Sequence, residues 1–349
     1  MFHGSVYDSG FSRKERRRPM TSTRSRSRIW SIILAGGEGE RTRPLIERWL
    51  GSPVPKQYCA FVGTRSMLQH TWDRADQVAP PEQKITVIAQ HHRQRLWSQL
   101  ERQTGQLLLQ PCNRDTAAGI FLPLTYVRAW DPTATVVVYP SDHFVYPEAP
   151  FIETVRRAVR ATEVLSDRMC VLGVRPTGLM LDYGWIEVGR VLGWCGGSMM
   201  RQVQAFLEKP DMLRGLSALA NGAFWNTLVI AANVHTLWTL GWRHLPELME
   251  RFEQLEQAVG TPQEGAVLKA IYAQMPCRNF SSDLLQRAAD GIGVIELQDV
   301  LWSDWGRPER IVETLRVLGK EPAFPYELLG EPSLQYNAAG SSIDVVNSP

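Results

Sequence analysis

The strongest signal in this 349-residue chain is the segment Ile32-Ile33-Leu34-Ala35-Gly36-Gly37-Glu38-Gly39-Glu40-Arg41-Thr42-Arg43-Pro44-Leu45. It begins with aliphatic and β-branched residues, which is typical of a buried strand, and three glycines then follow within four positions. Glycines let backbone N–H groups approach a phosphate chain closely, and Arg41 adds a cationic fork for phosphate oxygens. A strand that leads into such a loop is how α/β proteins hold nucleotides.

The spacing of these glycines matches neither G-x-G-x-x-G nor the G-x-x-x-x-G-K-[ST] motif. A dinucleotide-dependent dehydrogenase and a P-loop NTPase are therefore both disfavoured. We interpret the segment as a nucleotide-binding loop of another kind. A tight turn without a ligand is the alternative that this segment alone leaves open.

Apolar runs rich in β-branched residues alternate along the chain with longer helical patterns. The predicted strands are Trp30–Leu34, Ile85–Ala89, Gln106–Gln110, Thr135–Tyr139, Met169–Val174, Val203–Leu207, Thr227–Ala232 and Gly293–Leu297. The predicted helices are Met67–Gln77, His92–Gln103, Thr116–Ala129, Phe151–Leu165 and Leu237–Leu255. This alternation predicts an α/β fold with a Rossmann-like, mostly parallel (mixed) sheet flanked by helices. For residues 182–200, the sequence predicts loops and a hairpin that lies over the sheet edge.

The charge is unevenly distributed, although the net charge is only +2. Residues 1–28 carry seven arginines and one lysine against Asp8 and Glu15, and they show no apolar periodicity. We expect a disordered, solvated basic arm there, with a tether to nucleic acid or an acidic surface as the alternative. Residues 29–315 are predicted to form one catalytic domain, and residues 316–349 a C-terminal helix and tail that is partly disordered.

The five cysteines are widely spread and none lies in a C-x-x-C pair. This pattern disfavours a disulfide framework and a structural zinc site, and it favours reduced thiols in a cytoplasmic protein. No apolar run reaches the roughly 18 residues of a membrane span, and no nucleic-acid-binding motif accompanies the basic arm. We therefore expect neither membrane nor nucleic acid as a partner.

Two further motifs place charged groups at strand ends. In Val138-Tyr139-Pro140-Ser141-Asp142-His143, a buried strand ends in proline and presents Asp142 at the sheet edge where α/β proteins bind ligands. A carboxylate there suits Mg²⁺ shared with substrate phosphates, whereas a helix-capping aspartate is the simpler alternative. In Phe206-Leu207-Glu208-Lys209-Pro210, Lys209 suits a phosphate and Glu208 suits sugar hydroxyls, unless the two form only an exposed charge pair.

These motifs, together with Pro55-Lys56-Gln57, Phe224-Trp225-Asn226 and Leu301-Trp302-Ser303-Asp304-Trp305-Gly306, occur in the order seen in sugar-phosphate nucleotidyltransferases. The chain resembles that family from about residue 30 to 315, and it is most similar to the bacterial mannose-1-phosphate guanylyltransferases. It departs from the family pattern where Thr42 replaces leucine, where Thr227 and Leu228 replace serine and glycine, and where Arg307 and Pro308 follow Gly306.

The resemblance implies a role for each matching residue. Arg41, Lys56 and Lys209 would be catalytic, and Asp142 with Asp304 would hold Mg²⁺. Sugar binding would fall to Gly184, Glu208 and Asn226. Nucleotide binding would fall to Leu34, Ala35, Gly36, Gly37, Gly39, Arg114, Thr116 and Ser141. Arg114 and Thr116 lie in Gln110-Pro111-Cys112-Asn113-Arg114-Asp115-Thr116-Ala117, which is similar to a motif of the guanylyl-specific group.

The implied reaction is attack of mannose 1-phosphate on the α-phosphorus of GTP, which yields GDP-mannose and pyrophosphate. Another base or sugar is the nearest alternative, for example a thymidylyl or uridylyl transfer to glucose 1-phosphate. A catalytically weak paralogue that binds a sugar nucleotide and regulates a partner is an alternative of a different class. Hydrophobic residues in 265–315 further suggest a homodimer surface.

Overall fold

The computed structural model describes residues 28–97, 99 and 105–329. A nine-stranded sheet has the order β3-β2-β1-β4-β9-β6-β10-β8-β7. Its strands are β1 (Ile29–Ala35), β2 (Lys84–Ala89), β3 (Gln106–Gln110), β4 (Thr135–Pro140), β6 (Met169–Val174), β7 (Gly184–Cys195), β8 (Ser198–Glu208), β9 (Phe224–Asn233) and β10 (Ile292–Glu296). Only β8 and β9 run against the other strands, so the predicted mixed, mostly parallel sheet is confirmed.

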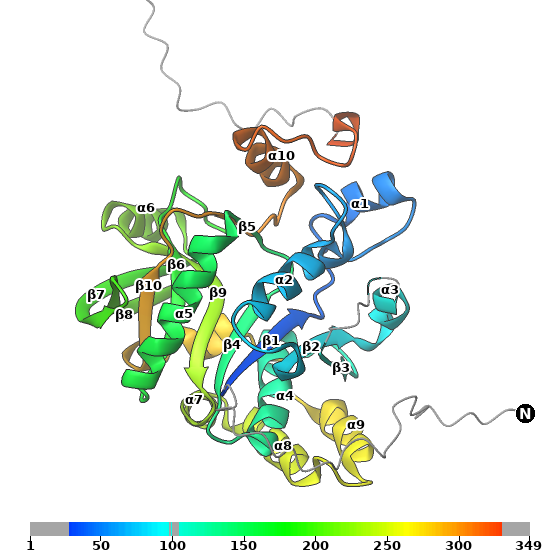
Figure 1. The fold of residues 1–349 in the computed structure, drawn as a ribbon, viewed down its shortest axis with the longest axis vertical. Coiled ribbons are helices and arrows are strands. Elements are labelled where there is room, and N and C mark those ends of the chain that lie inside the picture. Colours follow the sequence, from blue (N-terminus) through cyan, green and yellow to red (C-terminus); the bar gives the residue numbers. More distant parts are fainter. Residues whose placement is uncertain (1–27, 98, 100–104, 330–349) are drawn as a thin grey trace, which may run out of the picture.

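Helices cover both faces of this sheet (Figure 1). The alternation of side chains along each strand explains why, since Ile32 packs into the core under one face and Ile33 into the core under the other. The first core lies beneath α4 (Asp115–Trp130), α7 (Val234–His244), α8 (Pro246–Ala258) and α9 (Glu264–Gln274). The second core lies beneath α2 (Met67–Asp76) and α5 (Glu148–Val164).

A small two-stranded sheet and a third apolar core complete the architecture. β5 (Phe144–Tyr146) pairs antiparallel with β11 (Leu301–Ser303), apart from the main sheet. The third core joins α1 (Arg43–Leu50) to α10 (Pro308–Val317), and Figure 1 shows these two helices at the end of the molecule opposite α8 and α9. The remaining described helices are the short α3 (Arg93–Trp97) and α6 (Met212–Ala220).

Some boundaries differ from the predictions. The predicted helix Leu237–Leu255 is wrong, because it is divided at Leu245, where Pro246 opens α8. The predicted strand Val203–Leu207 is only the second half of β8. The first half of β8 pairs with β7 in a hairpin, and this hairpin is part of the sheet, whereas the sequence predicted a hairpin lying over the sheet edge. α10 crosses the boundary predicted at residue 315. The predicted basic arm, most of the tail and the end of the helix His92–Gln103 lie outside the described residues.

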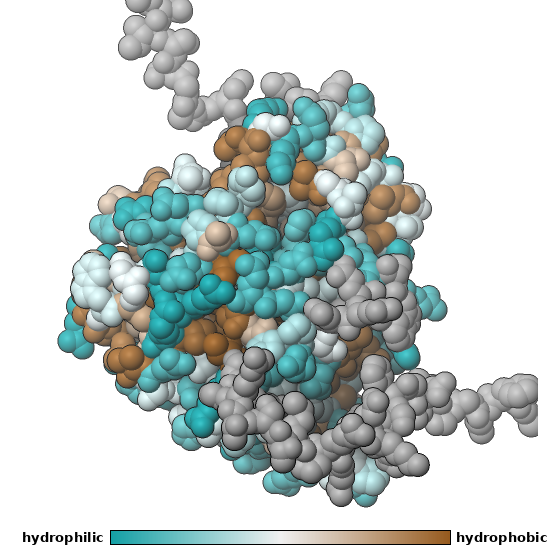
Figure 2. Space-filling model, in the orientation of Figure 1, coloured by the Kyte–Doolittle hydropathy of each residue, from teal (hydrophilic) through white to brown (hydrophobic). Residues whose placement is uncertain are grey.

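Within the described residues, none of the helices combines the length and apolar character that crossing a bilayer requires. On the face shown in Figure 2, apolar surface forms separate patches divided by polar side chains.

A buried ion pair fixes α2 to β2. Lys84 is only 1% exposed, and its ammonium group donates to Asp76 Oδ1 at 2.5 Å. We expect Asp76→Ala to lower the free energy of unfolding by about 3 kcal/mol, because the buried ammonium loses this carboxylate. Adding Lys84→Met should recover most of that loss, since the double variant buries no uncompensated charge. Urea unfolding followed by circular dichroism measures both variants; equal stability of the single and double variants would contradict the prediction.

Candidate active site

The glycine loop after β1 is held by a buried glutamine. Gln57 Nε2 donates to the backbone oxygens of Ala35 and Gly37, at 2.9 and 2.8 Å. Gly39 has φ of +64°, and a Cβ at that position would lie 3.1 Å from the Cβ of Lys56. Glycine is therefore required there both for the left-handed backbone and for the close approach of Lys56. The loop then enters α1, so that Arg41 projects from the turn between loop and helix.

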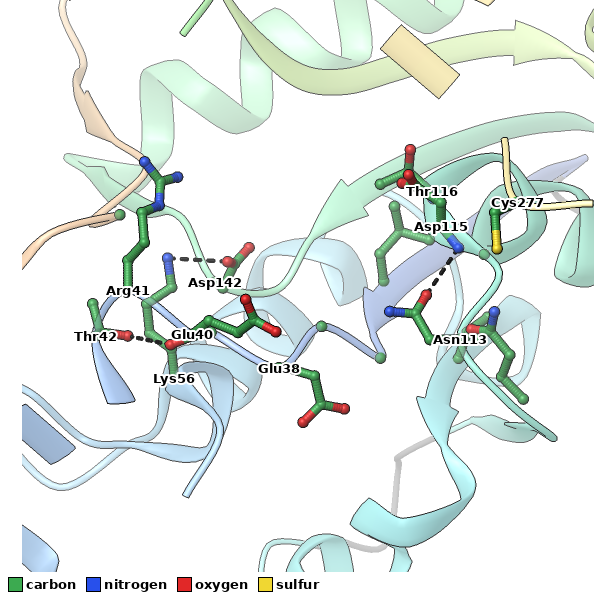
Figure 3. A pocket seen from close by; sticks show the side chains of 18 residues that line it. Glu38, Glu40, Arg41, Thr42, Lys56, Asn113, Asp115, Thr116, Asp142 and Cys277 are labelled. Atoms are coloured by element: carbon green, nitrogen blue, oxygen red, sulfur yellow. Dashed lines mark hydrogen bonds and ion pairs between the residues drawn. The ribbon is translucent and has the colours of Figure 1, made fainter. Parts of the chain in front are cut away.

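Lys56 lies at the centre of the site with a side chain that is only 5% exposed. Its ammonium group is 3.0 Å from Asp142 Oδ2 and 2.5 Å from the backbone oxygen of Asp304. One buried cation thus joins the loop after β4 to the loop after β11. The Lys56–Asp142 pair is visible in Figure 3.

The small sheet brings Asp142 and Asp304 together, although they are far apart in sequence. Asp142 lies two residues before Phe144, Asp304 directly follows Ser303, and Phe144 pairs with Ser303 in the β5–β11 register. β11 does not belong to the main sheet, so the two carboxylates are brought together by an antiparallel ribbon and not by the ends of two strands of the main sheet.

The Asp304 carboxylate is oriented by three donors. Oδ1 accepts hydrogen bonds from Tyr183 Oη (2.9 Å), Arg310 Nη1 (2.8 Å) and Gly306 N (2.8 Å). A Cβ on Gly306 would collide with Oδ2, so a glycine is needed beside this oxygen. The bonding leaves Oδ2 as the oxygen of Asp304 that is available for a ligand.

Both aspartates are ionised by their surroundings. Burial alone would raise the pKa of Asp142, but the Lys56 and His143 charges bring it below its usual value. For Asp304, burial is likewise outweighed by Arg310 and Lys56, and the pKa is lowered. Two ionised carboxylates with a free oxygen fit Mg²⁺, which takes one or two protein carboxylates and completes its shell with phosphate and water oxygens.

Arg41 is bound to another carboxylate, Asp182. Its Nη1 lies 2.7 Å from Asp182 Oδ2, and its Nη2 lies 3.9 Å from Asp304 Oδ2. Asp182 also pairs with Arg307 at 3.4 Å and with the mostly buried Arg310. Burial is the largest single influence on Asp182 and raises its pKa, but the hydrogen bond and charge of Arg310, together with the charges of Arg307 and Arg41, outweigh it and the pKa is lowered. Sequence reasoning missed Asp182 and Arg310; Arg310 follows Asp304 by six residues and lies beyond the Leu301–Gly306 motif.

Arg41, Lys56 and Asp142 line one end of a cavity of about 660 Å³. Figure 3 shows Arg41, Lys56 and Asp142 at that end, and Asn113, Asp115, Thr116 and Cys277 at the other, with the glycine loop between them. One end is thus suited to phosphates and the other to a polar ring. The other lining residues are Leu34, Gly36, Gly37, Glu38, Gly39, Glu40, Thr42, Val87, Gln110, Gly119 and Gly306.

Three residues predicted to bind nucleotide are not among those that line this cavity. Ala35 is buried and accepts from Gln57, and Ser141 Oγ donates to the Leu34 backbone oxygen at 2.7 Å. The Arg114 guanidinium donates to the backbone oxygens of Tyr272 and Ala273. The bonded groups are the Ala35 backbone and the side chains of Ser141 and Arg114, and they support the walls of the cavity. Direct contact of these residues with nucleotide stays a prediction.

The residues predicted to bind sugar lie together beside the cavity. Lys209 Nζ is 3.6 Å from Glu208 Oε1, and Gly184 pairs with Glu208 across the β7–β8 hairpin. Burial raises the pKa of Glu208. Asn226 Oδ1 accepts from the backbone N–H of Leu228, which leaves its Nδ2 for a ligand. Leu228 keeps a left-handed backbone, with φ of +55°, where the resembling family has glycine.

Comparison with known proteins defines the class. A family model described as nucleotidyl transferase matches residues 30–321, so the chain belongs to the nucleotidyl transferase family. It is 30% identical over 292 residues to the xanthan biosynthesis protein XanB of Xanthomonas campestris pv. campestris (strain B100), covering 80% of this chain and 58% of that protein. It is 27% identical over 290 residues to the mannose-1-phosphate guanylyltransferase of Escherichia coli (strain K12), covering 81% and 59%. The chain therefore spans less than two thirds of either relative.

Solved structures agree with this assignment. A crystal structure described as mannose-1-phosphate geranyltransferase from Thermus thermophilus superposes with a TM-score of 0.69 at 26% identity, covering 82% of this chain and 79% of that one. The UTP-bound UGPase of Acinetobacter baumannii has a TM-score of 0.51 at 15% identity, covering 83% and 93%, which shows a shared fold only. The predicted family and fold class are both confirmed.

The Arg310 pairs make stability depend on pH. We expect Arg310→Met to lower the free energy of unfolding by about 2 kcal/mol at neutral pH, because Asp182 and Asp304 lose a mostly buried partner. Both folded-state pKa values lie below the unfolded value of about 4, so this stabilisation is present above that pH and is lost as the pH falls through the folded values. The difference between wild type and variant should therefore shrink below about pH 4.

Thermal or urea unfolding between about pH 3 and pH 7 with a chelator present measures this difference. Arg307→Met is the matched control, since its half-exposed guanidinium contacts Asp182 alone at 3.4 Å and should contribute little. A difference for Arg310→Met that is the same at both ends of this range would contradict the assignment.

Proposed function

We propose that this chain transfers a guanylyl group from GTP to mannose 1-phosphate, releasing pyrophosphate and GDP-mannose. The observation that carries the proposal is the two-ended cavity, in which Arg41, Lys56 and Asp142 gather at one end and the polar side chains of Asn113, Asp115 and Thr116 at the other. The names of the relatives support mannose 1-phosphate as the acceptor and guanylyl as the group transferred.

The chemistry requires charge compensation rather than a general base. A phosphate monoester is largely dianionic near neutral pH, because its second pKa is about 6, so its oxygen attacks without losing a proton. The new bond joins this oxygen to the α-phosphorus, and the bond from the α-phosphorus to the bridging oxygen breaks, which releases pyrophosphate. The protein must hold two polyanions in line and stabilise charge on the leaving group.

The side chains divide this work. Lys56, which pairs with Asp142, would bind the α-phosphate, and Lys209, which pairs with Glu208, would bind the sugar phosphate. Arg41 would leave Asp182 to bind the β- and γ-phosphates and then the pyrophosphate. Asp142 and Asp304 would hold Mg²⁺, which supplies further positive charge at the phosphates.

The nearest alternative keeps this chemistry but changes the base or the sugar. Thr227 and Leu228 stand beside Asn226 where the resembling family has serine and glycine, and this difference favours another sugar. The deciding experiment measures pyrophosphate release with Mg²⁺, crossing GTP, dTTP, UTP and ATP against mannose 1-phosphate and glucose 1-phosphate. We expect pyrophosphate release with GTP and mannose 1-phosphate. Release with a different pair would keep the chemistry and assign a different base or sugar. Nucleotide binding without release from any pair would favour the regulatory paralogue.

The metal assignment predicts the effect of one substitution. Asp142→Asn should reduce Mg²⁺-dependent turnover at least about 100-fold, because the ion loses an anionic ligand. The circular dichroism spectrum and melting behaviour should stay near those of wild type, since the side chain is partly exposed. Turnover at the wild-type rate would refute the assignment of Asp142.

The sugar-phosphate assignment predicts a selective effect on one substrate. Lys209→Ala should raise the KM for the sugar 1-phosphate about tenfold or more and leave the KM for the nucleotide nearly unchanged, because only one phosphate loses its cation. Lys269→Ala, at an exposed lysine of α9, is the matched control. Equal increases in both KM values would contradict a contact confined to the sugar phosphate.

A further inference from the structure

Two histidines and a glutamate that the proposed reaction does not use meet at the rim of the cavity. Glu38 belongs to the glycine loop after β1, and His91 and His92 belong to the turn after β2. Because β1 and β2 are parallel neighbours, these two segments leave the sheet side by side. Glu38 Oε1 lies 2.8 Å from His91 Nε2 and 3.4 Å from His92 Nε2. Figure 3 shows the Glu38 carboxylate pointing away from Lys56 and Asp142.

His92 is the unusual member of this cluster. It is only 3% exposed, and its ring packs edge-on against Tyr58 with centroids 5.6 Å apart. Within the described part of the chain its ring nitrogens make only weak contacts, with Glu38 and with the Ala35 backbone, and no hydrogen bond of ordinary geometry. Burying an imidazole without such bonds is costly unless the ring serves another purpose. Its orientation is fixed by packing, and Nε2 is directed at Glu38.

We propose that Glu38, His91 and His92 bind a divalent cation of the borderline class, such as Zn²⁺ or Co²⁺. One atom from each residue lies within 4.8 Å of the others. Metal–nitrogen and metal–oxygen bonds of about 2.1 Å place neighbouring ligand atoms about 3.4 Å apart in a tetrahedral site. The separation of His92 from Glu38 is 3.4 Å, and the 2.8 Å between His91 and Glu38 would lengthen slightly when an ion replaces their hydrogen bond. Two imidazoles and one carboxylate suit this class of ion, whereas the oxygen-only pair of Asp142 and Asp304 suits Mg²⁺.

The surroundings leave the site both oriented and accessible. Arg43 Nη2 lies 3.4 Å from Glu38 Oε2, so the guanidinium occupies one carboxylate oxygen and Oε1 remains for the ion. The His91 side chain is 66% exposed, which gives a cation and its water ligands a path from solvent.

A cation there would also change the charge of the nucleotide cavity. Glu38 lines that cavity, and its negative charge, which Arg43 offsets from one side, disfavours a triphosphate nearby. A bound divalent ion would add two positive charges at this rim and tie the glycine loop to the turn after β2. The site stands without the proposed function, because binding of the metal alone is measured with no substrate present.

The test titrates the full chain with Co²⁺ and follows its visible absorption, with Zn²⁺ calorimetry as a second measurement. A Cys112→Ser/Cys277→Ser background removes two exposed thiols that compete for these ions. We expect one Co²⁺ per chain, and at least about tenfold weaker binding after His91→Ala or Glu38→Gln. His91 is exposed, so its loss should leave the fold intact even where a His92 variant would not.

Two controls separate this site from others. His235→Ala, at an exposed histidine of α7, and Asp142→Asn should both keep the wild-type affinity for Co²⁺. Millimolar Mg²⁺ should not displace the ion. Equal affinities of wild type, His91→Ala and Glu38→Gln would overturn the proposal, as would the absence of Co²⁺ and Zn²⁺ binding at millimolar concentration; Glu38 and His91 would then form only an ion pair.

Discussion

The site depends on one buried ammonium group, that of Lys56. It touches Asp142 after β4 and the backbone of Asp304 after β11, and its Cβ lies against Gly39 of the loop after β1. Three segments that are far apart in sequence are thereby held at one edge of the sheet. A buried cation is tolerated only where oxygen atoms surround it, so the position of Lys56 also fixes the positions of the two carboxylates.

Pairing of opposite charges also explains why acidic and basic side chains alternate beside the cavity. Asp304 and Asp182 share Arg310, and Asp182 also holds Arg41. Each carboxylate pre-orients a cation that a phosphate would otherwise have to order on binding, which lowers the entropic cost of association. Under the proposed function this arrangement also creates competition, because a phosphate would have to displace Asp182 before Arg41 could bind it.

Much of this could be predicted from the sequence, and the exceptions have physical reasons. The strand at Trp30–Leu34, its glycine loop and Asp142 are local signals, since apolar runs, glycines and a strand-ending proline act over a few residues. The meeting of Asp142 with Asp304 depends instead on the β5–β11 ribbon, whose strands of three residues are too short for a pattern to reveal. Asp182 and Arg310 carry no motif, and only tertiary packing brings them together.

Leu228 has a left-handed backbone, which a leucine rarely adopts. It stands where the resembling family has glycine, yet its backbone keeps the left-handed conformation, with φ of +55°. The strain is compensated locally: Asn226 Oδ1 accepts from Leu228 N, Thr227 Oγ1 donates to the Leu172 backbone oxygen, and the leucine side chain packs on the core. The left-handed backbone beside Asn226 is therefore kept despite the leucine, and the two substitutions differ from the family pattern in their side chains. Under the proposed function, such a difference would alter which sugar fits while leaving the phosphate chemistry at Lys56 intact.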